Sequence, residues 1–229
     1  MPEPTADALV DRLVELADPA ELPGLRRRLP PGEPVLGVRM RHLFDAAAAH
    51  VAMPLEQVHR LLDHEAYEPR LAAFCVLDFR ARGHLDDAGR DDLARVYLDR
   101  HDRITSWDMV DRAAPRVLGR WLVGRALTPL RELAAAPEPL HRRSAVTAPL
   151  WFARYGPDED LRASLEVAAR VAADPDPLVH KAVGILLGHA GARVPDAVRG
   201  FLDRHAASMA RPAVRQATSK LPASDRGRW

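Results

Sequence analysis

Proline and glycine interrupt helical spacing of the apolar residues about every 12 to 20 residues along the chain, and this punctuation limits the fold more than any other feature. No run alternates apolar and polar residues in the manner of a strand, and no Asn-Gly or Asp-Gly pair joins two such runs. The sequence therefore predicts an all-α protein with a rigid turn at LPPGEP, residues 29–34. The expected helices span 5–17, 37–51, 54–63, 67–81, 86–101, 106–124, 126–135, 139–154, 158–173, 176–190, 194–208 and 211–220.

The second helices of successive pairs share a pattern, in which a basic residue stands just ahead of a small one. The five basic anchors are Arg70, Arg112, Arg143, Lys181 and Arg215. Imperfect helix-pair repeats of about 30 to 45 residues are typical of α-solenoids of the HEAT or armadillo kind, in which each pair buries its apolar stripe against the next. We therefore expect a single HEAT-like repeat domain over 1–229, with an N-terminal cap at 1–35 and a frayed tail at 222–229.

Charge is divided unevenly along the chain. Residues 1–111 contain 14 Lys and Arg against 21 Asp and Glu, whereas residues 112–229 contain 19 against 11. Basic anchors repeated in every second helix would form a stripe along the concave surface of a solenoid, and such a groove fits DNA phosphates. Periodicity alone leaves alternatives open. The arginine content also fits a GC-rich genome, the anchors Arg70, Arg112 and Arg215 also suit ion pairs with adjacent repeats, and the groove also suits a protein partner or a scaffold.

Several kinds of chemistry lack their sequence signatures. The chain has no Gly-rich phosphate loop, no GxSxG and no HExxH, and its ten histidines show no metal-ligand spacing. The single cysteine, Cys75, lies in the apolar run LAAFCVLDF and is expected to be a small core side chain. We expect neither a metal nor another cofactor. No apolar run reaches the roughly 18 residues that span a bilayer, and the N-terminus has early acids and no basic signal segment, so a cytoplasmic protein is expected.

The segment SWDMVD, residues 106–111, places an aromatic ring and a carboxylate on one helix face. Trp107 and Asp111 are four residues apart and so project from the same side. Ser106 as N-cap and Asp108 in the first turn fit ordinary helix-start chemistry, but Asp111 lies more than a turn inside the helix. A tryptophan at helical spacing is usually a core residue, and two others in apolar runs are predicted to be structural: Trp121 and Trp151.

Nearly the whole chain resembles the AlkD-like DNA alkylation-repair glycosylases, an all-helical HEAT-like family. The resemblance rests on SWDMVD followed about 30 residues later by RRSAV, a strong joint signal. It extends to the segments GVRMRHL (37–43), EPRLAAFCVLDF (68–79), RRSAVTAPLWF (142–152) and HKAVG (180–184). The resemblance implies an α-solenoid that forms a right-handed superhelix with a basic concave groove.

The same resemblance implies hydrolysis of the N-glycosidic bond of N3- or N7-alkylated purines in double-stranded DNA. It assigns the catalytic cluster to Trp107, Asp111 and Arg143. A carboxylate at Asp111 would stabilise an oxocarbenium-like sugar, the Trp107 ring would add cation–π attraction, and Arg143 would hold a phosphate. The family leaves the lesion in or near the duplex, so bulky adducts are also expected substrates.

Four further residues are expected to contact DNA phosphates: Arg142, His180, Lys181 and Arg215. The alternative for each of them is a plain surface or ion-pair role. One departure from the family pattern is Ile185, which stands where a second groove tryptophan is expected. We expect a monomer without cofactor in the cytoplasm, associated with the nucleoid. Two other functions stay open: a non-catalytic HEAT-like module that binds damaged or branched DNA, and a protein-binding scaffold.

Overall fold

A computed structural model describes residues 4–225 and 227–229, and the chain divides into two compact units, Met1–Ala113 and Ala114–Trp229. The described residues contain helices and one isolated β-bridge, between Ala17 and Val38, and no strand. The predicted all-α class is therefore confirmed. The expectation of one continuous domain over 1–229 stays a prediction.

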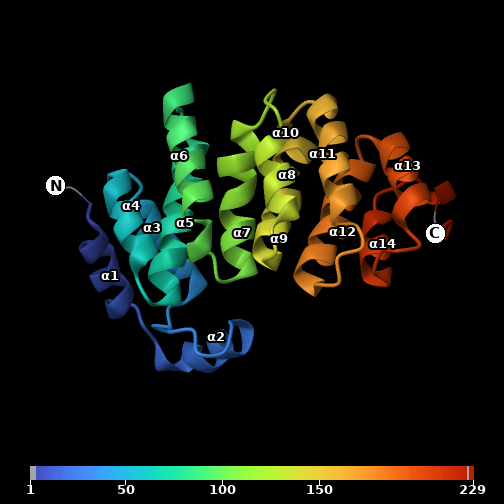
Figure 1. Ribbon diagram of the computed structural model, residues 1–229. Helices are drawn as coiled ribbons and strands as arrows, with labels where there is room; N and C mark the ends of the chain where they lie inside the picture. Colours follow the sequence, from blue (N-terminus) through green and yellow to red (C-terminus); the bar gives the residue numbers. More distant parts are fainter. Residues whose placement is uncertain (1–3, 226) are drawn as a thin grey trace. The chain divides into compact units, whose positions relative to one another are not determined.

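The first unit consists of α-helices and two short 3-10 helices, and its α2 and α3 are joined by the loop 29–39 (Figure 1). Helix α5 packs against α3, α4 and α7, so it is the central helix of this unit. The elements are α1 (Ala6–Glu15), η1 (Pro19–Glu21), α2 (Leu22–Arg28), α3 (Met40–Ala49), α4 (Leu55–Asp63), α5 (Tyr67–Arg82), α6 (Asp87–Asp99), η2 (His101–Arg103) and α7 (Trp107–Ala113).

Helix α5 is buried on nearly all sides, which explains its almost uniformly apolar middle. Phe74 is fully buried and meets the ring of Tyr97 from α6 edge to face, with ring centroids 6.0 Å apart. Cys75 is fully buried as well, and burial raises the pKa of its thiol to about 12. The predicted core role of Cys75 is confirmed, and its thiol stays protonated near neutral pH.

A buried carboxylate on α5 holds the loop that precedes α3. Glu68 is fully buried and accepts hydrogen bonds from the backbone N–H groups of Leu36, Gly37 and Val38, at 2.9, 2.8 and 3.2 Å. Gly37 has a φ of +93°, and an added Cβ would lie 2.8 Å from the carbonyl oxygen of Asp18. The loop therefore depends on one glycine and one buried acid.

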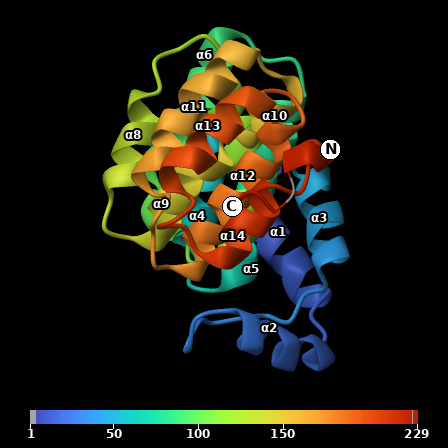
Figure 2. The same cartoon turned by 90° about the vertical axis from the view of Figure 1, so that its right-hand side faces the viewer.

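The second unit has two layers of helices. Helices α8, α11 and α13 pack side by side in one layer, while α12 packs between α9 and α14 in the other (Figures 1 and 2). This is the arrangement expected of stacked helix pairs. The elements are η3 (Ala114–Gly119), α8 (Thr128–Ala135), α9 (Pro139–Thr147), α10 (Leu150–Tyr155), α11 (Asp158–Arg170), α12 (Pro177–Gly191), α13 (Pro195–His205), α14 (Arg211–Ala217) and η4 (Ala223–Asp225).

Two glycines allow helices of this unit to touch through their backbones. A Cβ added at Gly119 would lie 2.1 Å from the carbonyl oxygen of Ala148. A Cβ at Gly184 of α12 would lie 2.8 Å from the carbonyl oxygen of Ala213 in α14. Both distances are too short for any side chain, so the close packing of these helices requires glycine.

The observed helices differ from the predicted ones at prolines. The predicted helix 139–154 is two helices, because Pro149 cannot donate a hydrogen bond inside a helix. The predicted helix 106–124 becomes α7 followed by six π-helical residues, η3, which begin next to Pro115. Helix α2 was not predicted, since Pro23 and Gly24 resemble turn residues, but Pro23 stands at the first positions of a helix, where proline is tolerated.

The tail predicted to be frayed, 222–229, is instead attached to α13 in its described part. Asp225 is buried and accepts a hydrogen bond from Arg199 at 2.9 Å. Arg228 and Trp229 both donate to the carboxylate of Asp203, at 3.0 and 2.8 Å. Charged and aromatic tail residues thus find partners on α13, which the composition of PASDRGRW does not indicate.

Candidate DNA-binding and catalytic site

Helix α7 presents the predicted aromatic–carboxylate face to the surface. It packs on α5 through Met109, Val110 and Ala113, which are fully buried. Trp107 is 37% exposed, and Asp111, one turn further, is also exposed. The indole and the carboxylate therefore lie on the solvent-facing side of the same helix, outside the hydrophobic core.

A polar network fixes the start of α7. Asp108 accepts hydrogen bonds from the hydroxyl of Ser106 and from the phenol of buried Tyr67, the latter at 2.5 Å. Arg28 of α2 lies 3.6 Å from the same carboxylate. Burial first, and then the charge of Asp108, raise the pKa of Tyr67 far above its ordinary range, so Tyr67 remains a donor. Asp108 is in the first turn as predicted, and this network anchors the turn that carries Trp107.

The helix changes its winding just after Asp111. Pro115 has no N–H, so it cannot form the α-helical hydrogen bond to the carbonyl of Asp111. The residues Ala114–Gly119 are π-helical, a winding that is rare and often found at functional sites. Trp107 and Asp111 lie before this change and keep ordinary α-helical spacing.

Two predicted basic anchors of the first unit are occupied by ion pairs. Arg70 is 5% exposed and pairs with Glu33. Arg112 lies 3.3 Å from the fully buried carboxylate of Asp78 and stacks over Phe44, with 3.8 Å from the guanidinium carbon to the ring centroid. The ion-pair alternative therefore holds for Arg70 and Arg112, and Arg112 shares Asp78 with Arg82, which lies 2.6 Å from the same carboxylate.

The residues proposed around phosphates in the second unit divide into two groups. Arg143 on α9 is 3% exposed and donates to the carbonyl of Leu178 at 2.5 Å. Its neighbour Arg142 donates to Asp174 at 2.6 Å and to the carbonyls of Ala136 and Pro137, and this hydrogen bond to Asp174 raises its pKa. Both arginines thus stabilise the protein itself.

The other group lies on the second helices α12 and α14. Lys181 and Arg215 are exposed, whereas His180 and Ile185 are half-buried. Neither Lys181 nor Arg215 has an ion-pair partner among the described residues. Lys181 and Arg215 are therefore the predicted anchors that stay open to an anionic partner.

An aromatic pair in the second unit was not predicted from the sequence. Trp151 is half-buried rather than enclosed in the core, and its ring centroid lies 4.6 Å from that of exposed Tyr155. Trp121 is also half-buried, below the guanidinium of Arg125 at 5.2 Å. Their apolar neighbours in the sequence suggested a core role. The signal for a surface position was a basic residue one helical turn further along, Arg125 after Trp121 and Arg154 after Trp151.

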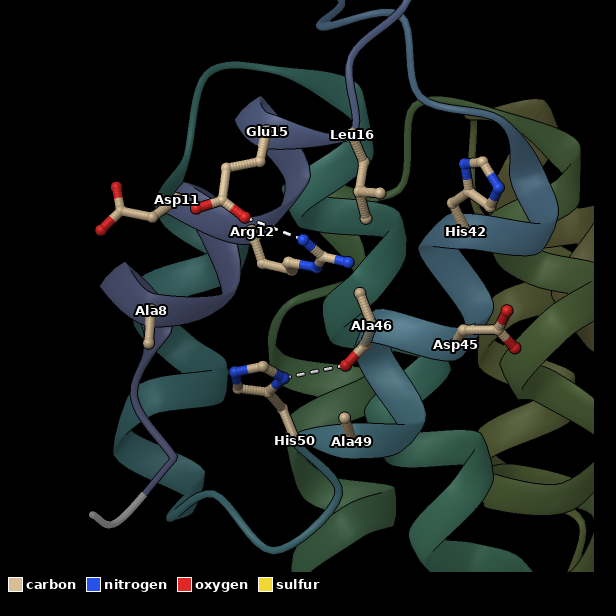
Figure 3. A pocket seen from close by; sticks show the side chains of 10 residues that line it. All are labelled: Ala8, Asp11, Arg12, Glu15, Leu16, His42, Asp45, Ala46, Ala49 and His50. Carbon is tan, nitrogen blue, oxygen red and sulfur yellow. Dashed lines mark hydrogen bonds and ion pairs between the residues drawn. The ribbon is translucent and has the colours of Figure 1, made fainter. Parts of the chain in front are cut away.

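A hollow of about 660 Å³ lies between α1 and α3 of the first unit (Figure 3). Three carboxylates line it, from Asp11, Glu15 and Asp45, and the guanidinium of Arg12 is paired with Glu15 at 2.8 Å. This negative lining would repel DNA phosphates. The hollow is therefore not a candidate for the phosphate-binding surface.

The described residues lack two further features, a membrane-spanning helix and a metal-binding cluster. None of their helices combines the length and the apolar character needed to cross a bilayer. They also contain no group of three or more His, Cys, Asp or Glu residues arranged to hold a metal ion.

Comparison with known proteins gives a family and a fold. The family described as "DNA alkylation repair enzyme" matches residues 9–221. No curated protein matches the chain. Among solved structures, AlkD2 from Streptococcus mutans is 14% identical with a TM-score of 0.62, covering 96% of this chain and 100% of its own. The protein smu.31 from Streptococcus mutans UA159 is 15% identical with a TM-score of 0.54, covering 80% and 86%.

These likenesses confirm the AlkD-like α-solenoid class that the sequence predicted. The family match spans nearly all of the described helices, from within α1 to beyond α14. The chain belongs to the DNA alkylation repair enzyme family.

Proposed function

We propose that the protein is a DNA glycosylase that hydrolyses the N-glycosidic bond of N3- or N7-alkylated purines in double-stranded DNA. The observation that carries this proposal is the exposed pair Trp107 and Asp111 on one face of α7. Membership of a DNA alkylation repair family supports the choice of substrate. Bulky N3 and N7 adducts are included, since a lesion left in the duplex need not fit a closed pocket.

The chemistry needs a negative charge more than it needs an acid. Alkylation at N3 or N7 makes the purine cationic, so it leaves without protonation. Positive charge then develops on the deoxyribose as the bond lengthens. A carboxylate about 4 Å from that charge, at an effective dielectric near 20, contributes about 4 kcal/mol, or about three powers of ten in rate.

Asp111 supplies this charge and orients the attacking water. As the neutral base leaves and the new C–O bond forms, the water passes one proton to the Asp111 carboxylate, which returns it to solvent. Trp107 presents the face of its indole to the cationic sugar or lesion, an attraction of about 0.5 to 2 kcal/mol. The network of Asp108, Tyr67 and Arg28 keeps the first turn of α7 in place while DNA is bound. The proposed reaction uses no metal or other cofactor.

Arg143 completes the proposed catalytic cluster, although its guanidinium is nearly enclosed. Because it donates to the carbonyl of Leu178, its role includes holding α9 to the first turn of α12. Lys181 of α12 and Arg215 of α14 supply the exposed positive charge for phosphates, and His180 precedes Lys181 in α12. Arg142 contributes less to DNA binding, since Asp174 already neutralises it. The protein acts as a cytoplasmic, nucleoid-associated monomer.

The test is release of free base from duplex DNA that carries 7-methylguanine, 3-methyladenine or one bulky N3-adenine adduct. Wild-type protein should release base, and Asp111→Asn should do so about 1,000-fold more slowly with unchanged DNA affinity. Asp92→Asn is the matched control, because Asp92 is an exposed carboxylate on α6 that pairs only locally with Arg95. Equal rates for wild type and Asp111→Asn would refute the role of Asp111.

A second candidate function is a non-catalytic module that binds damaged or branched DNA. Ile185 favours it, since the resemblance places a groove tryptophan at that position. The assay separates the two functions, because such a module binds the methylated duplex with a steep salt dependence and releases no base.

A further inference from the structure

A second exposed feature lies wholly within the second unit. A hollow of about 220 Å³ is formed where α10 packs against both η3 and α12. Arg116, Trp151, Arg154, Tyr155 and His189 are among its lining residues. We call it the Trp151–Tyr155 hollow.

Of the two aromatic rings of this hollow, that of Tyr155 is open to solvent and that of Trp151 is half-buried. Tyr155 is 56% exposed and its ring lies 4.6 Å from that of Trp151, tilted by 47°. The guanidinium of Arg154 lies 5.2 Å from the Tyr155 centroid, and that of Arg120 lies 5.6 Å from the Trp151 centroid. Exposed aromatic rings flanked by arginine are the usual platform on which unstacked bases lie in single-strand binding proteins.

The charge around the rings is positive. The lining residues of the hollow include no aspartate or glutamate. Lys220 approaches His189 to 3.2 Å at the edge of the hollow, and neither Lys220 nor Arg154 has an acidic partner among the described residues. Burial, and then the charges of Lys220 and Arg154, lower the pKa of His189. Arg154 and Lys220 therefore bring positive charge to this hollow without an acidic partner among the described residues.

We propose that the Trp151–Tyr155 hollow binds an unpaired nucleotide of a DNA strand, with the base stacked on Tyr155 and Trp151 and its phosphates against Arg154 and Lys220. The proposal rests on the proposed function only in taking DNA as the partner, not in the chemistry assigned to Asp111. A base inside an intact duplex has both faces covered by its neighbours, so it cannot offer a face to the rings. The hollow thus prefers DNA that carries an unpaired base.

The test compares binding of three undamaged DNAs by fluorescence anisotropy: a fully paired blunt duplex, the same duplex with one bulged thymidine, and a short oligothymidine. Wild-type protein should bind the bulged duplex more tightly than the paired one. Tyr155→Ala should weaken binding of the bulged duplex by about 5- to 150-fold, the range of losing one stacked base, and leave the paired duplex unchanged. Tyr155→Phe should retain the wild-type preference.

The matched control is Trp229→Ala. Trp229 also lies against an arginine, Arg228, at 4.9 Å, but Asp203 neutralises that arginine, so no effect on either duplex is expected. Tyr155 is half exposed, and circular dichroism of Tyr155→Ala checks that the fold is retained.

Three outcomes would overturn the proposal. The first is equal affinity of wild-type protein for the paired and bulged duplexes. The second is a loss for Tyr155→Ala no larger than for Trp229→Ala. The third is displacement of the bulged duplex by free thymidine monophosphate at concentrations similar to those of oligothymidine, which would make the hollow a mononucleotide site. Because these DNAs carry no methylated base, all of these outcomes are independent of whether the protein releases 7-methylguanine.

Discussion

Residues 1–113 contain 15 Lys and Arg against 21 Asp and Glu, while residues 114–229 contain 18 against 11. The two units also use basic side chains differently. In the first, the repeat anchors Arg70 and Arg112 are enclosed and paired with acids. In the second, the anchors Lys181 and Arg215 are exposed without acidic partners among the described residues. The repeated position thus serves stability at both anchors of the first unit. In the second unit it does so at Arg143 but stays open to a phosphate partner at Lys181 and Arg215.

The largest effect is expected from the buried charges of the first unit. Glu68→Ala should lower the free energy of unfolding by about 3 kcal/mol or more, because three backbone N–H groups lose their only carboxylate acceptor. Urea unfolding followed by circular dichroism measures this loss. Glu65→Ala, on the neighbouring turn, is the control. A loss below about 1 kcal/mol would mean that water replaces the carboxylate and that buried charge matters less in this unit than we infer.

A smaller loss is expected for the enclosed arginine of the second unit, which tests whether that unit also uses arginine for stability. Arg143→Ala should destabilise the protein by about 2 kcal/mol, since it removes a buried hydrogen bond to Leu178 and leaves a cavity. Thermal unfolding gives the stability, and anisotropy with duplex DNA gives the affinity. If the variant binds DNA more weakly but is fully stable, Arg143 serves only to bind phosphate. The hydrogen bond to Leu178 then adds nothing to the free energy of unfolding.

Exposed basic residues should affect DNA affinity and not stability. Replacing Lys181 or Arg215 with alanine should each reduce the slope of log affinity against log salt by about 0.9 for duplex DNA, which is the effect of one lost phosphate contact. Arg26→Ala and Arg27→Ala, exposed in α2 of the first unit, are the controls. Equal slopes for all four variants would show that the difference between the units does not extend to DNA.

The smallest effect concerns the proton on His189. Its pKa is lowered by burial and by the charges of Lys220 and Arg154, so the folded protein disfavours protonation. Stability should therefore fall slightly as the pH drops below the ordinary histidine value of about 6.5. Lys220→Ala should raise the pKa of His189, as measured by an NMR titration of the imidazole. An unchanged pKa would place Lys220 too far away to add to the positive charge of the Trp151–Tyr155 hollow.

The sequence predicted the helices well wherever apolar spacing and a clear punctuation agreed, as in α5 and α12. It failed where proline changed the winding within a pattern that looked continuous, at Pro115 and Pro149. Periodicity reports which face of a helix is apolar, but it does not report whether one missing N–H ends the helix or widens it.

For the candidate site, the spacing of Trp107 and Asp111 was enough to predict a shared face, and the structure adds that this face is exposed. The partners of arginines were not predictable in the same way. Arg70 meets Glu33, 37 residues away, and Arg142 meets Asp174, 32 residues away. Such pairs depend on how consecutive helices stack, and single-sequence patterns contain no information on that register. Tyr155 was missed for a related reason, because its surroundings depend on how α10 packs against η3 and α12.

The contact at Gly119 makes mutational tolerance asymmetric. On one side, any replacement of glycine adds a carbon that would sit 2.1 Å from an oxygen. On the other side, the contact is made by the carbonyl of residue 148, which every amino acid possesses. A library of variants should therefore accept no substitution at position 119, while this contact places no demand on the identity of its neighbour. Sequence comparison would therefore show a constraint from this contact at position 119, where a methyl group must be absent, and none at position 148.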